Sequence, residues 1–282
     1  MARMDLVIQA PDIATPQIKE LARLVEAEAI SALSAASTQA FRLSSARQRV
    51  GVAELCAEAG IDFGFVPDDQ RVDRVRLVAM DMDSTLISIE CVDEIADLQG
   101  IKPEIAAITA SAMRGEIDFR ESLTRRVALL AGLDIAALAR VYDERLKLSP
   151  GAERMLAGFA RAGAKTLLVS GGFTFFTERL KARLGLDHAV ASTLEIAGGR
   201  LTGRISGEIV DGQVKAAAFA RLGRELKGDD GLLVAIGDGA NDLPMLRLAD
   251  VSVAYHAKPI VRAKTTYAID YCGLDAVLNL FM

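Results

Sequence analysis

The chain has 282 residues, of which 51% are hydrophobic and 25% charged, and it carries a net charge of −5. This length allows about two domains, and the acidic balance argues against nucleic acid as a partner. No run of 18 apolar residues occurs and the first 20 residues lack a sustained apolar region, so we expect no membrane segment, no membrane partner and no signal peptide. We therefore predict a cytoplasmic protein.

The first part of the chain alternates short strand-like and helix-like patterns. In order, these predict a strand at 5–10, a helix at 16–29, a hairpin at 30–44, a helix at 45–60 and a strand at 61–67. The order β-α-β-β-α-β is typical of a small ferredoxin-like α+β module. We predict an N-terminal domain over residues 1–72, with the polar stretch 67–74 as the linker.

A second pattern, of apolar strands alternating with amphipathic helices, fills residues 73–282. Strands at 75–81, 164–172 and 231–239 predict an α/β domain with a parallel sheet. Residues 90–148 have helical periodicity without a strand pattern, which predicts a helical insert, or cap, over the strand ends. Residues 191–210 contain a Gly-Gly turn between alternating runs and predict a hairpin.

Polar residues follow each of the three predicted core strands. Asp81 and Asp83 end the first strand, Ser170 and Gly171 end the second, and Asp238 ends the third. Open α/β sheets bind ligands at the carboxyl ends of their strands, so these residues should meet in one crevice. Two carboxylates about 4 Å apart repel by roughly 4 kcal/mol at an effective dielectric of 20, and a hard cation relieves that repulsion. Oxygen ligands without nearby histidine favour Mg²⁺.

Each of these segments also has a purely structural explanation when it is taken alone. The stretch "DST" after Asp81 suits a helix cap, "SGGF" suits a capped tight turn, Asp242 suits a helix cap, and Lys215 suits a solvated helix position. The functional interpretation depends on the combination. "GDGANDL" fails as a dinucleotide-binding motif and "GFARAGAKT" fails as a phosphate-binding P-loop, because their spacings are wrong.

The combined segments resemble the haloacid dehalogenase (HAD) superfamily of phosphotransferases. The motifs appear here as "DMDST", "VSGG", Lys215 and "GDGAND", within residues 75–270. The resemblance implies a Rossmann-like HAD core with a parallel sheet and a helical cap. It also implies that Asp81 is the nucleophile, that Asp83 is the general acid and base, and that Asp81, the main-chain carbonyl of Asp83, and Asp238 hold Mg²⁺. Phosphate-contacting roles would fall to Ser170, Gly171 and Lys215, with Thr85 and Asp242 in support.

The stretches "STLISIECVDEIA", "FRESLTRRVALL" and "GDGANDLPML" look like those of the phosphoserine phosphatase family. That resemblance implies hydrolysis of O-phospho-L-serine, the last step of serine biosynthesis, through an aspartyl-phosphate. Glu90 would meet the substrate ammonium group, Arg126 its carboxylate, and Asn241 would contact substrate or order the site. The helical spacing supports Arg126 independently, because it places this residue beside the apolar stripe of Leu123 and Leu130.

Other functions remain as alternatives to this hypothesis. A related phosphatase for another small phosphomonoester would keep the same motifs, and a phosphoaspartate signalling module also uses clustered aspartates, a hydroxyl residue and a lysine. A cysteine-based phosphatase is disfavoured, because none of Cys56, Cys91 and Cys272 has an arginine six residues later. These three scattered cysteines are better explained as buried free thiols in a reducing compartment.

The N-terminal module resembles, in architecture only, small regulatory domains that bind amino acids. A role in dimerisation or folding is equally compatible with its pattern. The partners that we expect are a small phosphomonoester and, as an open alternative to a monomer, a second copy of the chain.

Overall fold

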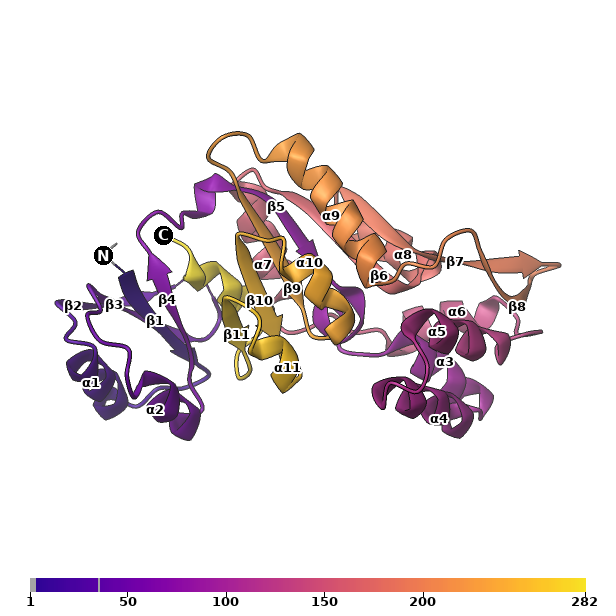
Figure 1. The fold of residues 1–282 in the computed structure, drawn as a ribbon, viewed down its shortest axis with the longest axis horizontal. Coiled ribbons are helices and arrows are strands. Elements are labelled where there is room, and N and C mark those ends of the chain that lie inside the picture. Colours follow the sequence, from indigo (N-terminus) through magenta and orange to yellow (C-terminus); the bar gives the residue numbers. More distant parts are fainter. Residues whose placement is uncertain (1–3, 35) are drawn as a thin grey trace.

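The structure is a computed structural model that describes residues 4–34 and 36–282. Residues 1–3 and 35, which belong to the predicted N-terminal domain and its hairpin, lie outside the described residues. Figure 1 shows a small sheet at one end of the molecule, a group of helices at the other end, and the large sheet between them.

The small sheet is antiparallel, with the strand order β2-β3-β1-β4. Its elements are β1 (Met4–Ala10), α1 (Thr15–Leu24), β2 (Ala29–Leu33), β3 (Gln39–Ser44), α2 (Val52–Ala59) and β4 (Asp62–Pro67). Both helices contribute to one apolar cluster with the sheet, through Leu21 of α1 and Val52 of α2 against Leu6 and Ile8 of β1. The predicted β-α-β-β-α-β order and the hairpin are therefore confirmed.

Both predicted N-terminal helices were too long. The first ends at Leu24 instead of residue 29, because Glu26 adopts a left-handed backbone (φ 55°) and the Ala27 amide turns back to the carbonyl of Ala22. The second begins only at Val52, after Gly51 has reversed the chain with φ 82°.

The large sheet has the strand order β11-β10-β9-β5-β6-β7-β8 and is parallel except for the β7–β8 hairpin. Its strands are β5 (Val75–Met80), β6 (Lys165–Phe173), β7 (His188–Ala197), β8 (Arg200–Ser206), β9 (Leu232–Gly237), β10 (Val251–Tyr255) and β11 (Tyr267–Ile269). Its helices are α7 (Ala152–Arg161), α8 (Thr174–Leu184), α9 (Gly212–Leu226), α10 (Leu243–Leu246) and α11 (Pro259–Arg262). The predicted parallel sheet with a hairpin is confirmed.

Helices cover both faces of the large sheet, which explains why its central strands are continuously apolar. Leu77 and Ala79 of β5 belong to one apolar cluster with Phe219 of α9, while Val78 and Met80 belong to the other, with Phe159 of α7. Alternate residues of one strand thus face opposite layers. Because both faces of the central strands are buried and apolar, polar side chains are found in the turns that follow the strands.

The segment between β5 and α7, residues 90–148, folds into helices and contains no strand. We call it the helical insert. It comprises α3 (Cys91–Gln99), α4 (Lys102–Met113), α5 (Phe119–Ala128), α6 (Ala136–Arg140) and a short π-helix, Val141–Arg145. Figure 1 shows these helices beside the β7–β8 hairpin, at the end of the molecule opposite the small sheet.

The small sheet is joined to the large one through buried polar contacts. The carboxylate of Asp62 accepts hydrogen bonds from the backbone amides of Asp270 (2.7 Å), Tyr271 and Cys272 (2.9 Å). Gln70, in the predicted linker, is buried and donates through Nε2 to the carbonyl of Leu280 at 2.6 Å. The segment 67–74 is therefore tied to the core.

Among the described residues, no helix is both long and apolar enough to cross a membrane.

Candidate active site

The carboxyl ends of β5 and β9, which are neighbours in the sheet, bring three aspartates together. One carboxylate oxygen each of Asp81, Asp238 and Asp242 lies within 4.8 Å of the others. Asp81 directly follows β5, Asp238 follows β9, and Asp242 ends the short turn after it. Asp81 and Asp238 were expected to meet at the strand ends, whereas the third carboxylate of the cluster is that of Asp242 and not that of Asp83.

Lys215 enters this cluster from helix α9 and is fully buried. Its Nζ lies 2.7 Å from Oδ1 of Asp81 and 2.7 Å from Oδ1 of Asp242. Burial disfavours the ammonium charge, but the carboxylates of Asp242 and Asp81 outweigh it, so the pKa of Lys215 is raised. The explanation of Lys215 as a solvated residue is therefore wrong.

Burial raises the pKa of Asp81 well above its ordinary value, with the neighbouring Asp242 acting in the same direction and Lys215 against it. Burial, followed by Asp242, also raises the pKa of Asp238 to about 6. Three carboxylates beside a single ammonium leave an excess of buried negative charge. Such a cluster has a strong electrostatic preference for a further cation.

The hydrogen bonds indicate where that cation fits. Both oxygens of Asp242 have donors, namely Lys215 Nζ at 2.7 Å and the Gly239 amide at 3.0 Å. Asp81 uses Oδ1 for Lys215 and the Met82 amide, and Asp238 uses Oδ1 for the hydroxyl of Thr85. Within the described part of the chain, no hydrogen bond reaches Oδ2 of Asp81 or of Asp238. Each of these two clustered carboxylates thus keeps one oxygen free of hydrogen bonds, and this donor set fits a hard divalent cation.

Asp83 lies on the other side of the same turn and is separate from the three clustered carboxylates. Its Oδ1 accepts a hydrogen bond from the Cys91 amide at 2.9 Å, at the start of α3 in the helical insert. Burial, followed by the charge of Glu90, raises the pKa of Asp83 to about 7. A carboxyl with this pKa can both donate and accept a proton near neutral pH.

Near its C-terminal end, strand β6 has backbone groups that are not paired with the neighbouring strand β7. Pairing with β7 is interrupted between Val169 and Phe173, and the Ser170 hydroxyl accepts a hydrogen bond from the Gly172 amide at 2.9 Å. A Cβ added to Gly172 would lie 3.0 Å from Oδ2 of Asp83, and one added to Gly171 would lie 2.6 Å from the ring of Phe119 in the insert. A side chain at position 171 would force the Phe119 ring to shift and one at position 172 would crowd Asp83, so the two glycines favour this close approach.

Glu90 and Arg126 reach the site from the helical insert. Glu90 is exposed, and its Oε1 accepts a hydrogen bond from Ser84 Oγ at 2.7 Å. Arg126 lies beside the buried stripe of α5, as its spacing predicted, and its Nε is buried without a hydrogen-bond partner. Burial lowers the pKa of Arg126, against the opposing charges of Asp93, Glu90 and Asp83. A half-buried guanidinium with an unsatisfied buried donor suits an anionic ligand.

Asn241 completes the predicted set. It lies in the turn after β9, and its side chain is folded over Gly239, so that a Cβ at Gly239 would be 2.2 Å from Asn241 Oδ1. All the residues singled out from the sequence thus lie on the strand-end turns, on α9 or on the insert. Two residues that the sequence argument missed, Arg120 and Asp211, form an ion pair between the insert and α9. The N-cap pattern of Asp211 before α9 was the available signal.

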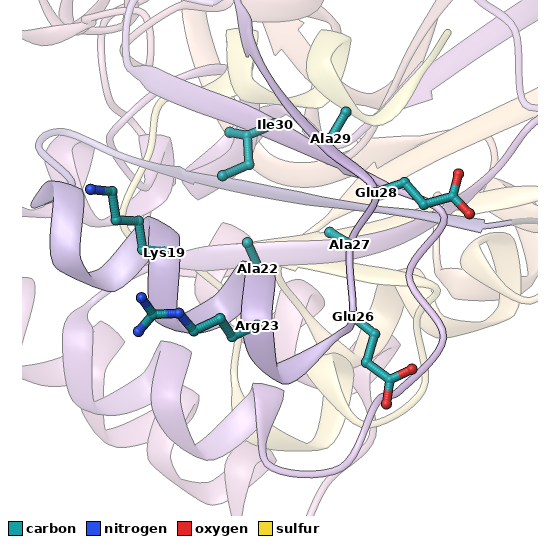
Figure 2. A pocket seen from close by; sticks show the side chains of 8 residues that line it. All are labelled: Lys19, Ala22, Arg23, Glu26, Ala27, Glu28, Ala29 and Ile30. Atoms are coloured by element: carbon teal, nitrogen blue, oxygen red, sulfur yellow. The ribbon is translucent and has the colours of Figure 1, made fainter.

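Two surface cavities lie away from these aspartates. One, about 490 Å³, is shallow and lies between α1 and β2, as Figure 2 shows. The other, about 480 Å³, lies between β4 and β11. Neither is lined by a residue of the aspartate site, so the chemistry does not belong to them.

The geometry agrees with comparisons to known proteins. The family model described as haloacid dehalogenase-like hydrolase matches residues 78–247, and a domain of unknown function matches residues 6–52. The chain belongs to the haloacid dehalogenase-like hydrolases.

Within this family, the similarity is to phosphoserine phosphatases. A phosphoserine phosphatase from Polaromonas sp. is 50% identical over 226 residues, which cover 78% of this chain and 96% of the relative. A crystal structure of a HAD family hydrolase from Salmonella enterica serovar Typhi aligns with a TM-score of 0.89 at 34% identity, over 100% of this chain and 99% of that one. A structure of a phospho-aspartyl intermediate analogue of phosphoserine phosphatase aligns with a TM-score of 0.68 at 34% identity, over 74% of this chain and 100% of that one.

Proposed function

We propose that the chain hydrolyses O-phospho-L-serine to L-serine and phosphate, the last step of serine biosynthesis, with residues 73–282 as the catalytic domain. The observation that carries the proposal is the combination of a lysine-paired Asp81, a carboxyl of raised pKa at Asp83, and a half-buried Arg126 that interacts with Asp83 and whose Nε has no partner. The turn after β5 then supplies both the nucleophile and the proton donor, and helix α5 of the insert supplies the carboxylate receptor.

In the first step, an oxygen of Asp81 attacks phosphorus while the bond from phosphorus to the serine oxygen breaks. Asp83 protonates that leaving oxygen, which its pKa of about 7 permits near neutral pH. The product is L-serine and an aspartyl-phosphate at Asp81. Lys215 stays paired with Asp81 and Asp242 at 2.7 Å, so its positive charge is fixed where negative charge gathers on the phosphoryl group.

In the second step, Asp83 accepts a proton from a water molecule, and the resulting hydroxide oxygen attacks phosphorus. The bond from phosphorus to Asp81 breaks, which releases phosphate and restores the free carboxylate. Asp83 is then protonated again for the next cycle. In the proposal, the helical insert, whose Cys91 amide donates a hydrogen bond to Asp83, excludes other water during the first step.

We propose Mg²⁺ as the cation, held by the free oxygens of Asp81 and Asp238 and by the main-chain carbonyl of Asp83. When bound, it would neutralise charge on the phosphoryl oxygens. Thr85 supports this arrangement by donating to Oδ1 of Asp238 at 3.0 Å, which leaves Oδ2 for the metal. Asp242 orients Lys215.

Substrate contacts in the proposal follow from position and charge. Ser170 and the Gly171 amide would bind the phosphate, at the point where β6 leaves its pairing. Arg126 would bind the serine carboxylate, Glu90 its ammonium group, and Asn241 would contact substrate from the β9 turn. Of these groups, Arg126 has a buried Nε with no hydrogen-bond partner in the protein, and a substrate carboxylate would satisfy it.

We place the reaction in the cytoplasm, because all three cysteines are buried free thiols, as expected in a reducing compartment. Residues 1–72 would form a separate N-terminal domain with a regulatory or assembly role.

A homodimer is part of the proposal on the basis of strand β2. This edge strand is almost wholly exposed, and its unpaired side is a ready template for a second copy of the chain. We expect sedimentation velocity to give a mass that rises to twice that of the chain with concentration. Ile30, 47% exposed on this edge, is the position to change: Ile30→Lys should keep the protein monomeric. A monomer for both proteins at every concentration would contradict the β2 interface.

The test of the function is phosphate release from L-phosphoserine, before and after removal of metal with EDTA. We expect many turnovers per chain, loss of activity with EDTA, and recovery when Mg²⁺ is added. Release of no more than one phosphate per chain would instead indicate a phosphoaspartate signalling module. Turnover of another phosphomonoester but not of phosphoserine would indicate a related phosphatase with a different substrate.

A further inference from the structure

We infer that Arg120 and Asp211 form a latch that holds the helical insert closed over the catalytic crevice. The inference rests on the proposed function, because the latch acts on substrate retention in that site. It assigns positioning roles to two residues that touch neither the clustered carboxylates nor the expected substrate.

The first observation is that this ion pair stands alone between the insert and the core. Arg120 Nε lies 2.5 Å from Asp211 Oδ2. Across the described residues, no other ion pair within 4.0 Å joins the insert, residues 90–148, to the remainder of the chain. Among the described residues, the insert therefore has one ion pair with the core, beside hydrogen bonds such as that from Arg200 to the Gly132 carbonyl at 2.7 Å.

The second observation is where the pair is anchored on the core. Asp211 is the N-cap of α9: its Oδ1 accepts from the amides of Gln213 (2.9 Å) and Val214 (3.0 Å), while Oδ2 is left for Arg120. One turn later on the same helix, Lys215 reaches Asp81. The latch thus joins the insert to the helix that carries the buried lysine.

The third observation concerns the two ends of α5. Beyond its C-terminal end, the insert is bonded to the β7–β8 hairpin through backbone atoms, from the Gly132 amide to the Leu201 carbonyl and from the Leu201 amide to the Leu133 carbonyl, both at 2.8 Å. At its N-terminal end, Arg120 follows Phe119, which packs on Gly171. Release of Arg120 would free the end of α5 nearest the phosphate site while the other end stays attached.

Asp211 is suited to this role because it is an anion at neutral pH. Burial alone would raise its pKa, but the amide of Val214 and the guanidinium of Arg120 outweigh that effect and lower it. The pair is also partly open to solvent, with side-chain exposures of 47% for Arg120 and 17% for Asp211. It can consequently break and re-form as substrate enters and product leaves, and it responds to salt.

The experiment compares steady-state kinetics of the wild type, Arg120→Ala, Asp211→Asn and the double variant. Asn keeps the capping oxygen of Asp211 and removes only its charge. The matched control is Arg125→Ala, since Arg125 pairs with Glu121 on the same helix, also at 2.5 Å, and makes no ion pair with the core.

We expect each single latch variant to raise KM for phosphoserine about threefold to fivefold, with kcat within twofold of wild type. The double variant should be no worse than either single variant, and 0.5 M NaCl should raise KM more in the wild type than in Arg120→Ala.

A KM for Arg120→Ala equal to that for Arg125→Ala would overturn the latch. Multiplicative effects of Arg120→Ala and Asp211→Asn would overturn it too, because they would mean that the two residues act independently. Absence of phosphoserine turnover in the wild type is a different result. It would contradict the proposed function itself, whatever the kinetics of the variants.

Discussion

Asp81→Asn should lower kcat for phosphoserine by about 10⁴-fold or more, because the amide cannot form the aspartyl-phosphate bond. The change is nearly isosteric and leaves Lys215 paired with Asp242, so the fold should persist. The measurement is phosphate release in Mg²⁺ at saturating substrate, alongside circular dichroism and thermal unfolding of both proteins.

Asp68→Asn is the matched control for this variant. Asp68 is an exposed aspartate outside the crevice, so its replacement should leave kcat unchanged. If Asp81→Asn retained a tenth or more of the wild-type kcat, Asp81 would not be the nucleophile, and the carboxylate cluster would need another explanation.

Arg126→Ala should lower kcat/KM for L-phosphoserine by about 10²-fold to 10³-fold, as expected for the loss of a buried, charge-assisted contact to the carboxylate. The informative comparison substrate is phosphoethanolamine, which keeps the phosphate and the ammonium group and lacks only the carboxylate. For this ester, kcat/KM should change by less than about threefold, since the lost contact has no partner on it. Initial rates on both substrates give the two ratios directly.

Arg125→Ala is the control for Arg126→Ala, because the neighbouring Arg125 is exposed and pairs with Glu121 within the insert. Arg125→Ala should leave kcat/KM unchanged for both L-phosphoserine and phosphoethanolamine. Equal losses on both substrates in Arg126→Ala would mean that Arg126 supports the shape of the insert and does not recognise the carboxylate.

The strand ends were predictable from the sequence because burial on both faces makes core strands continuously apolar. In the run Val75–Met80, the change from apolar residues to Asp81 therefore indicates where the strand ends. The position of Arg126 was predictable for a similar reason, since helical periodicity fixes which residues lie beside an apolar stripe. The ends of the N-terminal helices were not, because the left-handed turn at Glu26 does not follow from local composition.

Long-range partners were beyond the sequence argument. Nothing near Lys215 in the sequence indicates that it is buried between Asp81 and Asp242, and this placement depends on the packing of α9 against the sheet. The same is true of Arg120 and Asp211, which are 91 residues apart. The predicted linker 67–74 likewise has a polar sequence, while the fold buries Gln70 against the carbonyl of Leu280.

The contact of Phe119 with Gly171 joins a helix of the insert to a strand end of the core. A Cβ at position 171 would lie 2.6 Å from the Phe119 ring, so the space available to one residue is set by the size of the other. During divergence of the family, a side chain at 171 becomes tolerable only after a smaller residue has appeared at 119. These two positions should therefore change together in evolution.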